Sequence, residues 1–73
     1  MDNVFKVGNR VKHMSQLDVC FQIEALLHNE TEVWLDGYWL NTHYGCVPIK
    51  DGRDKIVIDK SQLPKWKVYC GHN

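Results

Sequence analysis

Residues 33–40 read VWLDGYWL, two apolar tripeptides on either side of an Asp-Gly dipeptide. Asp-Gly between apolar segments is typical of a two-residue β-turn, because both central residues of that turn need positive φ. The pattern therefore predicts a hairpin in which Trp34 pairs with Trp39 and Leu35 with Tyr38. Cross-strand partners share a face of the sheet, so both tryptophans are expected on the same side.

A second Asp-Gly dipeptide, at residues 51 and 52, predicts another hairpin between two apolar segments. In that register Val47 pairs with Ile56, and one face of the hairpin is expected in the core. The residues of this face are Val47, Ile49, Ile56 and Ile58. Pro48 then lies on the opposite face at an edge of the sheet, since proline cannot donate a hydrogen bond to the ladder.

The segments that flank these hairpins alternate in polarity and predict further strands. Residues 5–12 alternate apolar with basic side chains, which predicts a strand with a bulge at Gly8-Asn9. Residues 17–28 fit a strand, but Ser15 and Asp18 also resemble the capping box of a helix. We favour the strand because the alternation continues from residue 19 to residue 28, with β-branched and aromatic side chains in the inward set. That set is Val19, Phe21, Ile23, Ala25 and Leu27.

The C-terminal part predicts a short helical or 3₁₀ turn over residues 60–64 and a final strand over residues 66–70. Five or six short antiparallel strands with tight turns are typical of an all-β domain that bends into a small barrel or half-barrel. Without a linker or repeat, residues 1–73 are expected to form a single domain.

Two motifs carry a resemblance to a known family. The segment FKVGNRV at residues 5–11 is similar to the VGxxV first strand of SH3-like small barrels of the KOW or Tudor kind, and KSQL at residues 60–63 resembles the turn before their last strand. The resemblance implies an SH3-like barrel and a binding module for nucleic acid, for ribosomal or transcription components, or for peptides. The acidic middle and the Trp-rich segment depart from that pattern, so no family site residue is carried over.

Length and composition narrow the function classes. A chain of 73 residues, 44% of them hydrophobic, has one small core and no room for a catalytic domain beside a cofactor domain. No apolar run approaches the roughly 20 residues of a membrane span, and the first ten residues lack the apolar region of a signal peptide. We therefore expect a cytoplasmic protein, and the small size favours a bacterial or phage source.

Catalytic signatures are missing from the sequence. It contains no phosphate-binding loop, no HExxH motif and no dinucleotide-binding fingerprint. None of the four histidines has a nucleophile or a carboxylate beside it in a recognisable catalytic pattern. The sequence predicts a non-enzymatic binding module, a protein-binding adaptor or inhibitor, without a cofactor.

The cysteines are Cys20, Cys46 and Cys70. An odd number at long spacings, with no export signal, favours free core thiols over a disulfide framework. An alternative is a tetrahedral zinc site, although the two C-terminal ligands stand closer together than paired ligands usually do. Its ligands would be His43, Cys46, Cys70 and His72.

The predicted hairpin at residues 33–40 is apolar on both faces, whereas so small a domain has one core. The face with the tryptophans must be covered from within, by Trp66 or the N-terminal segment, or by a protein partner or a second copy. Exposed aromatic patches mark interaction sites, and Trp and Tyr are favoured there. The expected partner-binding residues are Trp34, Trp39, Tyr38 and Tyr44.

Charge is balanced overall but unevenly distributed. Residues 14–49 hold five acidic residues and no Lys or Arg, whereas both ends of the chain are basic. The alternative function is therefore nucleic-acid binding, in which cations contact phosphates and aromatic faces stack on bases. Its candidate residues are Lys6, Arg10, Lys12, Lys65, Trp66 and Lys67. The zero net charge and the acidic middle segment count against it.

Overall fold

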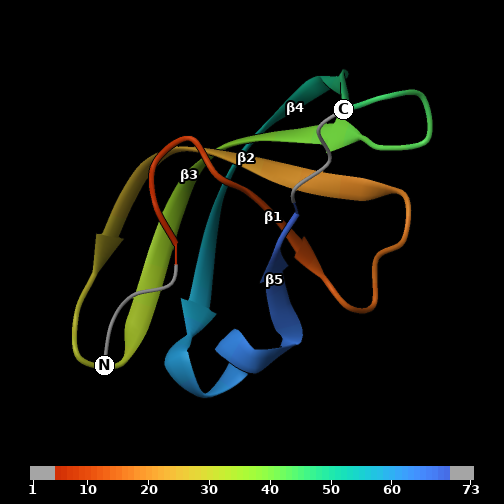
Figure 1. Ribbon diagram of the computed structural model, residues 1–73. Helices are drawn as coiled ribbons and strands as arrows, with labels where there is room; N and C mark the ends of the chain where they lie inside the picture. Colours follow the sequence, from red (N-terminus) through yellow and green to blue (C-terminus); the bar gives the residue numbers. More distant parts are fainter. Residues whose placement is uncertain (1–4, 70–73) are drawn as a thin grey trace.

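The computed structural model describes residues 5–69, which form one antiparallel sheet of five strands (Figure 1). The elements are β1 (Arg10–His13), β2 (Val19–His28), β3 (Glu32–Asn41), β4 (Val47–Asp59), the 3₁₀ helix η1 (Lys60–Lys65) and β5 (Trp66–Val68). The strands lie in the order β4-β3-β2-β1-β5, so β4 and β5 are the edges and the sheet is not closed into a barrel. The predicted all-β class, the strand number and the 3₁₀ turn before the last strand are confirmed.

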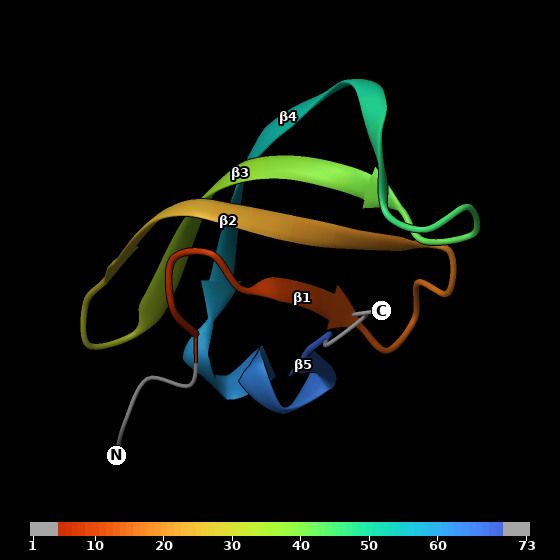
Figure 2. The same ribbon diagram turned by 45° about the horizontal axis from the view of Figure 1, so that its top comes forward.

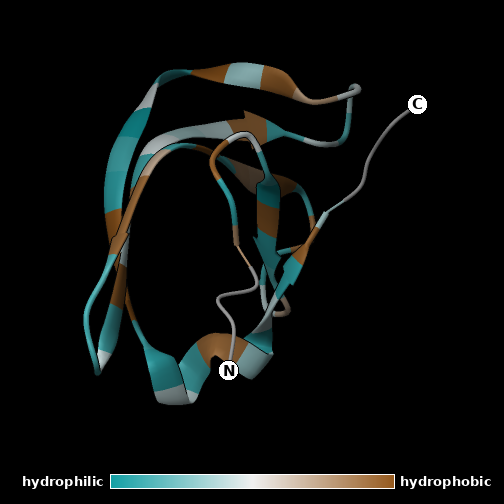
Figure 3. Cartoon of the chain, turned by 60° about the vertical axis from the view of Figure 1, so that its left-hand side comes forward, coloured by the Kyte–Doolittle hydropathy of each residue, from teal (hydrophilic) through white to brown (hydrophobic). Residues whose placement is uncertain are grey.

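Among residues 5–69 the sheet bends around an apolar core, and Figure 3 shows the strands curving round with η1 at the bottom of the view. The buried core residues are Phe5, Val11, Phe21, Ile23, Val33, Leu35 and Ile58. Leu63 of η1 and Trp66 of β5 pack against this cluster. We call the side of the sheet that faces the core the inner face, and the opposite side the outer face.

The hairpin predicted at Asp36-Gly37 is wrong, because residues 32–41 form one continuous strand. β3 pairs with β2 on one side and with β4 on the other, on both sides of Gly37. Here the glycine is needed for a close approach of two strands: a Cβ at residue 37 would lie 1.8 Å from the carbonyl oxygen of Gln22. Trp34 and Trp39 stand five positions apart on one strand, so they point to opposite faces.

The turn that joins β2 to β3 lies instead at residues 29–31. The side chain of Asn29 organises it, since its Oδ1 accepts hydrogen bonds from the backbone N–H groups of Thr31 and Glu32, both at 2.8 Å. Such side-chain bonds to the backbone are the reason that asparagine is favoured in turns. This turn places two ten-residue strands side by side.

The second predicted hairpin, at Asp51-Gly52, is also absent, because β4 continues through it (Figure 2). Residues 49–52 of β4 lie opposite the single residue Trp39, and this bulge of several residues bends the strand sharply. Asp51 has the positive φ, 58°, that the bend requires. Of the predicted core face, Ile58 is buried and Ile56 packs against the core, whereas Val47 and Ile49 stay exposed.

β2 confirms the strand predicted within residues 17–28, but a bulge after Ile23 divides it. Phe21 and Ile23 point into the core as predicted. Beyond the bulge the alternation is reversed, so Ala25 and Leu27 face outward rather than inward. The strand predicted over residues 5–12 begins only at residue 10, because residues 5–9 form a turn with Gly8 at a φ of 95°. The final strand covers Trp66–Val68, and Cys70 lies outside the described residues.

The cap of η1 makes part of the stability depend on the ionisation of Asp59. Asp59 Oδ1 accepts hydrogen bonds from Ser61 N at 2.9 Å and from Ser61 Oγ at 2.8 Å, and these bonds lower the pKa of Asp59 below its usual value of 3.8. A pKa that is lower in the folded than in the unfolded chain adds stability above about pH 4, and this is lost as the pH falls further. We therefore expect Asp59→Ala to lower the free energy of unfolding at pH 7 and to flatten its decline below about pH 4.

Urea denaturation between about pH 2 and pH 7 measures both effects. Asp59→Asn is the matched control, because asparagine keeps a capping oxygen but does not titrate. Asp59→Asn should retain most of the stability at pH 7. Its free energy of unfolding should still decline less than that of the parent protein below about pH 4. An Asp59→Ala variant with the same pH profile as the parent protein would contradict this account of the cap.

Candidate binding surfaces

An apolar row crosses three strands on the outer face. Leu27 of β2 pairs directly with Trp34 of β3, which pairs directly with Val57 of β4. Their exposed fractions are 68%, 48% and 58%, respectively. A shallow hollow of about 350 Å³ lies over these side chains, and Ala25, Asp36 and Lys55 also line it. We call Leu27, Trp34 and Val57 the apolar row.

Local structure explains why these three side chains meet on the outer face. The bulge in β2 reverses the alternation and turns Leu27 outward, beside Trp34. The indole of Trp34 is held in place by its own strand, since Nε1 donates a hydrogen bond to Glu32 Oε1 at 3.1 Å. The row is therefore a product of the register between β2 and β3, with its central ring oriented by a neighbouring carboxylate.

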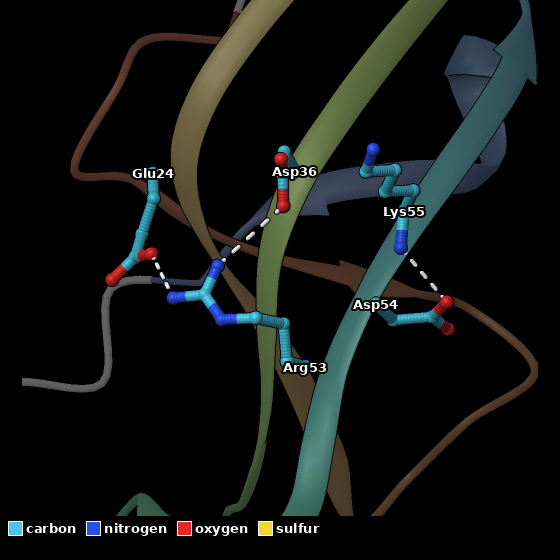
Figure 4. A network of polar contacts seen from close by, with 5 residues as sticks. All are labelled: Glu24, Asp36, Arg53, Asp54 and Lys55. Atoms are coloured by element: carbon cyan, nitrogen blue, oxygen red, sulfur yellow. Dashed lines mark hydrogen bonds and ion pairs between the residues drawn. The ribbon is translucent and has the colours of Figure 1, made fainter.

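Figure 4 shows an ion-pair network of Arg53, Glu24 and Asp36, and Asp36 also lines the hollow over the apolar row. Arg53 of β4 donates to Glu24 Oε1 of β2, and its Nη1 lies 3.5 Å from Asp36 Oδ1 of β3. The hydrogen bond to Glu24 is the main reason that the pKa of Arg53 is raised, and Asp36 adds to it. The guanidinium also lies 5.8 Å from the ring centre of Tyr38. Because these side chains are exposed, the pairs order this surface more than they stabilise the fold.

Carboxylates border the apolar row on the central strand. Glu32 and Asp36 stand on either side of Trp34, and Glu32 pairs across the strands with Asp59. Within residues 5–69 every ion pair involves Arg53, so Glu32 and Asp59 face each other without a basic partner. Like charges at paired positions repel. This end of the row therefore favours a basic group.

The structure does not bring the four predicted partner-binding residues together. Trp34 and Tyr38 lie on the outer face, as the preceding contacts place them. Trp39 is on the inner face, edge-on to Phe21 at 5.0 Å between ring centres, and its Nε1 donates to Asp54 Oδ2 at 3.1 Å. Tyr44 is 75% exposed in the loop between β3 and β4. No sequence pattern points to Leu27 and Val57 as contact residues, because only the strand register shows that they flank Trp34.

The predicted nucleic-acid-binding residues are also divided. Lys12 and Lys67 are direct partners between β1 and β5, with Arg10 two positions earlier in β1. Lys6 lies in the turn before β1, and Lys65 ends η1. Trp66 is on the inner face, edge-on to His13 at 5.0 Å between ring centres. The aromatic ring beside the lysines belongs to Tyr69, whose centre is 5.1 Å from Lys12 Nζ.

The described cysteines are free thiols. Cys20 is buried, and burial, with a smaller contribution from Cys46, raises its pKa to about 11, so the thiol is protonated at neutral pH. Of the predicted zinc ligands, His43 and Cys46 lie in or beside the loop between β3 and β4, whereas Cys70 and His72 are outside the described residues. Within residues 5–69, no three His, Cys, Asp or Glu side chains gather as a metal site requires.

Comparisons with known proteins identify no similar protein. No protein-family model matches the chain, and neither the curated proteins nor the solved structures contain a significant match. In the part of the chain that the structure describes, no helix has the length and apolar character needed to span a membrane. The surfaces themselves are therefore the basis for a functional proposal.

Proposed function

We propose that this protein is a non-enzymatic binding module with an SH3-like arrangement of strands, and that it captures a protein partner on the outer face of β2, β3 and β4. The observation that carries the proposal is the apolar row, which exposes Leu27, Trp34 and Val57 side by side. Covering such a patch removes apolar surface from water, which is favourable. The bent five-stranded sheet and the 3₁₀ helix before the last strand support the SH3-like assignment.

The charges beside the row favour a basic partner over a second copy. If two copies stacked face to face about a two-fold axis parallel to β3, Asp36 would meet Asp36 of the other copy. An axis across the strands would set Asp36 against Glu32 of the other copy. Arg53 partly compensates Asp36, but Glu32 has no ion pair within residues 5–69 and meets another carboxylate in both arrangements, which is unfavourable. The partner is therefore an apolar segment flanked by Lys or Arg.

The free energy of binding shows why the charges beside the apolar row matter. Covering roughly 300 Å² of apolar surface stabilises the complex by about 7 kcal/mol. Association itself costs roughly 4–15 kcal/mol in lost freedom of motion. The row alone thus supports only weak binding, and ion pairs between the partner and the bordering carboxylates are needed to set orientation and specificity.

A peptide titration tests the proposal. The probe is a synthetic peptide of about 15 residues that alternates Leu and Trp with Lys and Arg, added to ¹⁵N-labelled protein. The indole N–H signal of Trp34 should shift, whereas those of Trp39 and Trp66 should stay in place. Trp34→Ala should weaken binding at least about tenfold, as expected for an interface hot spot. Its fold should persist, because this side chain is half exposed on the outer face.

Tyr44→Ala is the matched control, since it removes an exposed aromatic ring outside the row. It should bind the peptide as the parent protein does. Equal affinity for a peptide with Asp and Glu in place of Lys and Arg would overturn the basic partner. Dimers that light scattering detects in the parent protein, and that Trp34→Ala abolishes, would identify a second copy as the occupant instead.

A further inference from the structure

A second surface lies on the outer face of β1 and β5, away from the apolar row. Lys12 and Lys67 are directly paired across the two strands, so their side chains share one face. Arg10 stands two positions before Lys12 on β1, and alternation places it on that face as well. Three cations thus lie close together at this end of the sheet. We call Arg10, Lys12 and Lys67 the basic strip.

The cations of the basic strip are held by neutral groups. Lys12 Nζ donates to the carbonyl oxygen of Leu17 at 2.7 Å, and Arg10 Nε donates to Gln22 Oε1 at 2.9 Å. Within residues 5–69 no ion pair reaches any of the three, since all ion pairs there belong to Arg53. The strip is therefore positively charged without internal compensation. Repulsion between Lys12 and Lys67 would be relieved by an anion bound between them.

The surroundings of the strip fit a ligand that carries both phosphate and an aromatic group. A hollow of about 170 Å³ is lined by Lys12 and Lys67 together with His13, Met14, Gln16 and Leu17, none of them a carboxylate. Lys12 Nζ lies over one face of the Tyr69 ring, 5.1 Å from its centre, so a base would stack on the opposite face. Cations next to an aromatic face are the combination that binds single strands, through phosphates and stacked bases.

We propose that the basic strip and Tyr69 bind a single-stranded nucleic acid, with the cations on its phosphates and a base stacked on the tyrosine ring. An unpaired strand fits better than a duplex, because paired bases could not reach the ring. An acidic peptide would satisfy the cations but leave the ring unused. This site shares no residue with the apolar row, so it stands independently of the proposed function.

Fluorescence anisotropy with a labelled 12-nucleotide oligo-dT tests the site at low salt and at increasing salt. Binding should weaken steeply with salt, because phosphate contacts release counterions. Lys12→Gln with Lys67→Gln should weaken binding at least about tenfold and lower the salt slope by roughly two. Lys50→Gln with Lys55→Gln is the matched control. It makes the same change in net charge on β4, at the opposite edge of the sheet.

A second measurement separates the contribution of base stacking to binding from that of the positive charges. Tyr69→Ala should weaken oligo-dT binding severalfold but leave binding of an abasic oligonucleotide unchanged. Equal loss of binding in the β4 control would overturn the site, and so would the absence of salt-dependent binding. Poly-glutamate that binds as tightly as oligo-dT, with no effect of Tyr69→Ala, would assign the strip to an acidic protein. Trp34→Ala should bind oligo-dT normally, which keeps this test distinct from that of the apolar row.

Discussion

Gly37→Ala is expected to remove a large part of the free energy of unfolding of the protein. An alanine Cβ at this position would lie 1.8 Å from the carbonyl oxygen of Gln22 and 3.1 Å from Cε2 of Phe21. The nearest obstacle is backbone of the adjacent strand, so rotating a side chain cannot relieve the clash. β2 and β3 would have to separate at Gly37, next to the core residue Phe21.

The expected cost exceeds that of ordinary overpacking. Extra methylene groups in a core cost about 1–3 kcal/mol, and a backbone clash costs more, so we expect a loss of at least about 3 kcal/mol. A domain of this size has a total stability of roughly 4–11 kcal/mol. Urea denaturation and the dispersion of amide NMR signals measure the outcome.

Gly8→Ala is the control for the conformational effect of adding a Cβ. Unlike Gly37, Gly8 has a positive φ, 95°, and beyond its chain neighbours no atom lies within 4 Å of the place that a Cβ would take. It should cost only about 1–2 kcal/mol, the strain of a left-handed alanine. If Gly37→Ala proved as stable as Gly8→Ala, the close approach of β2 to Gly37 and the continuous course of β3 would both be wrong.

Phe21→Ala should cost about 3–5 kcal/mol, the second large effect. The side chain is fully buried, and its ring packs edge-on against Trp39 with the centres 5.0 Å apart. Truncation leaves a cavity beneath the bend of the sheet and removes the aromatic contact that holds Trp39 against the core. Chemical denaturation gives the loss of stability, and tryptophan fluorescence should report a more exposed Trp39.

Phe21→Leu separates cavity formation from loss of the ring. Leucine refills much of the space, so this variant should lose less than half of what Phe21→Ala loses. A Phe21→Ala variant within about 1 kcal/mol of the parent protein would contradict the assignment of Phe21 to the core.

Both hairpins predicted from Asp-Gly are wrong for one physical reason. The dipeptide favours turns because glycine accepts unusual φ and tolerates close contact. At residue 37 the protein uses the second property, and the neighbour that demands it is the backbone of Gln22, fifteen positions away in the chain. At residue 52 close contact matters again, since a Cβ there would lie 2.8 Å from the carbonyl oxygen of Ile49. The positive φ belongs to Asp51, and the dipeptide bends one strand rather than reversing it. A local pattern cannot distinguish these uses.

Part of the candidate surfaces could be found from the sequence. It singled out Trp34 as a contact residue and Lys12 and Lys67 as phosphate contacts, from residue type and nearby charge. It missed Leu27 and Val57, whose neighbour is Trp34, and it offered Trp66 where the structure places Tyr69 beside the lysines. The chemistry of a residue can be recognised in a single segment, whereas its neighbours on a surface depend on pairing between segments.

Alternation of polarity was enough to establish the all-β class, the strand within residues 17–28 and the final strand, because period-two patterns require only local order. The 3₁₀ turn could be read locally as well, from residues 60–64. The face that each residue occupies, by contrast, follows only from the assembled sheet. The bulges after Ile23 and at residues 49–52 each reset the alternation, and they form where one strand must bend to stay paired with the next. That requirement arises from contacts between distant segments, so no single stretch of the chain records it.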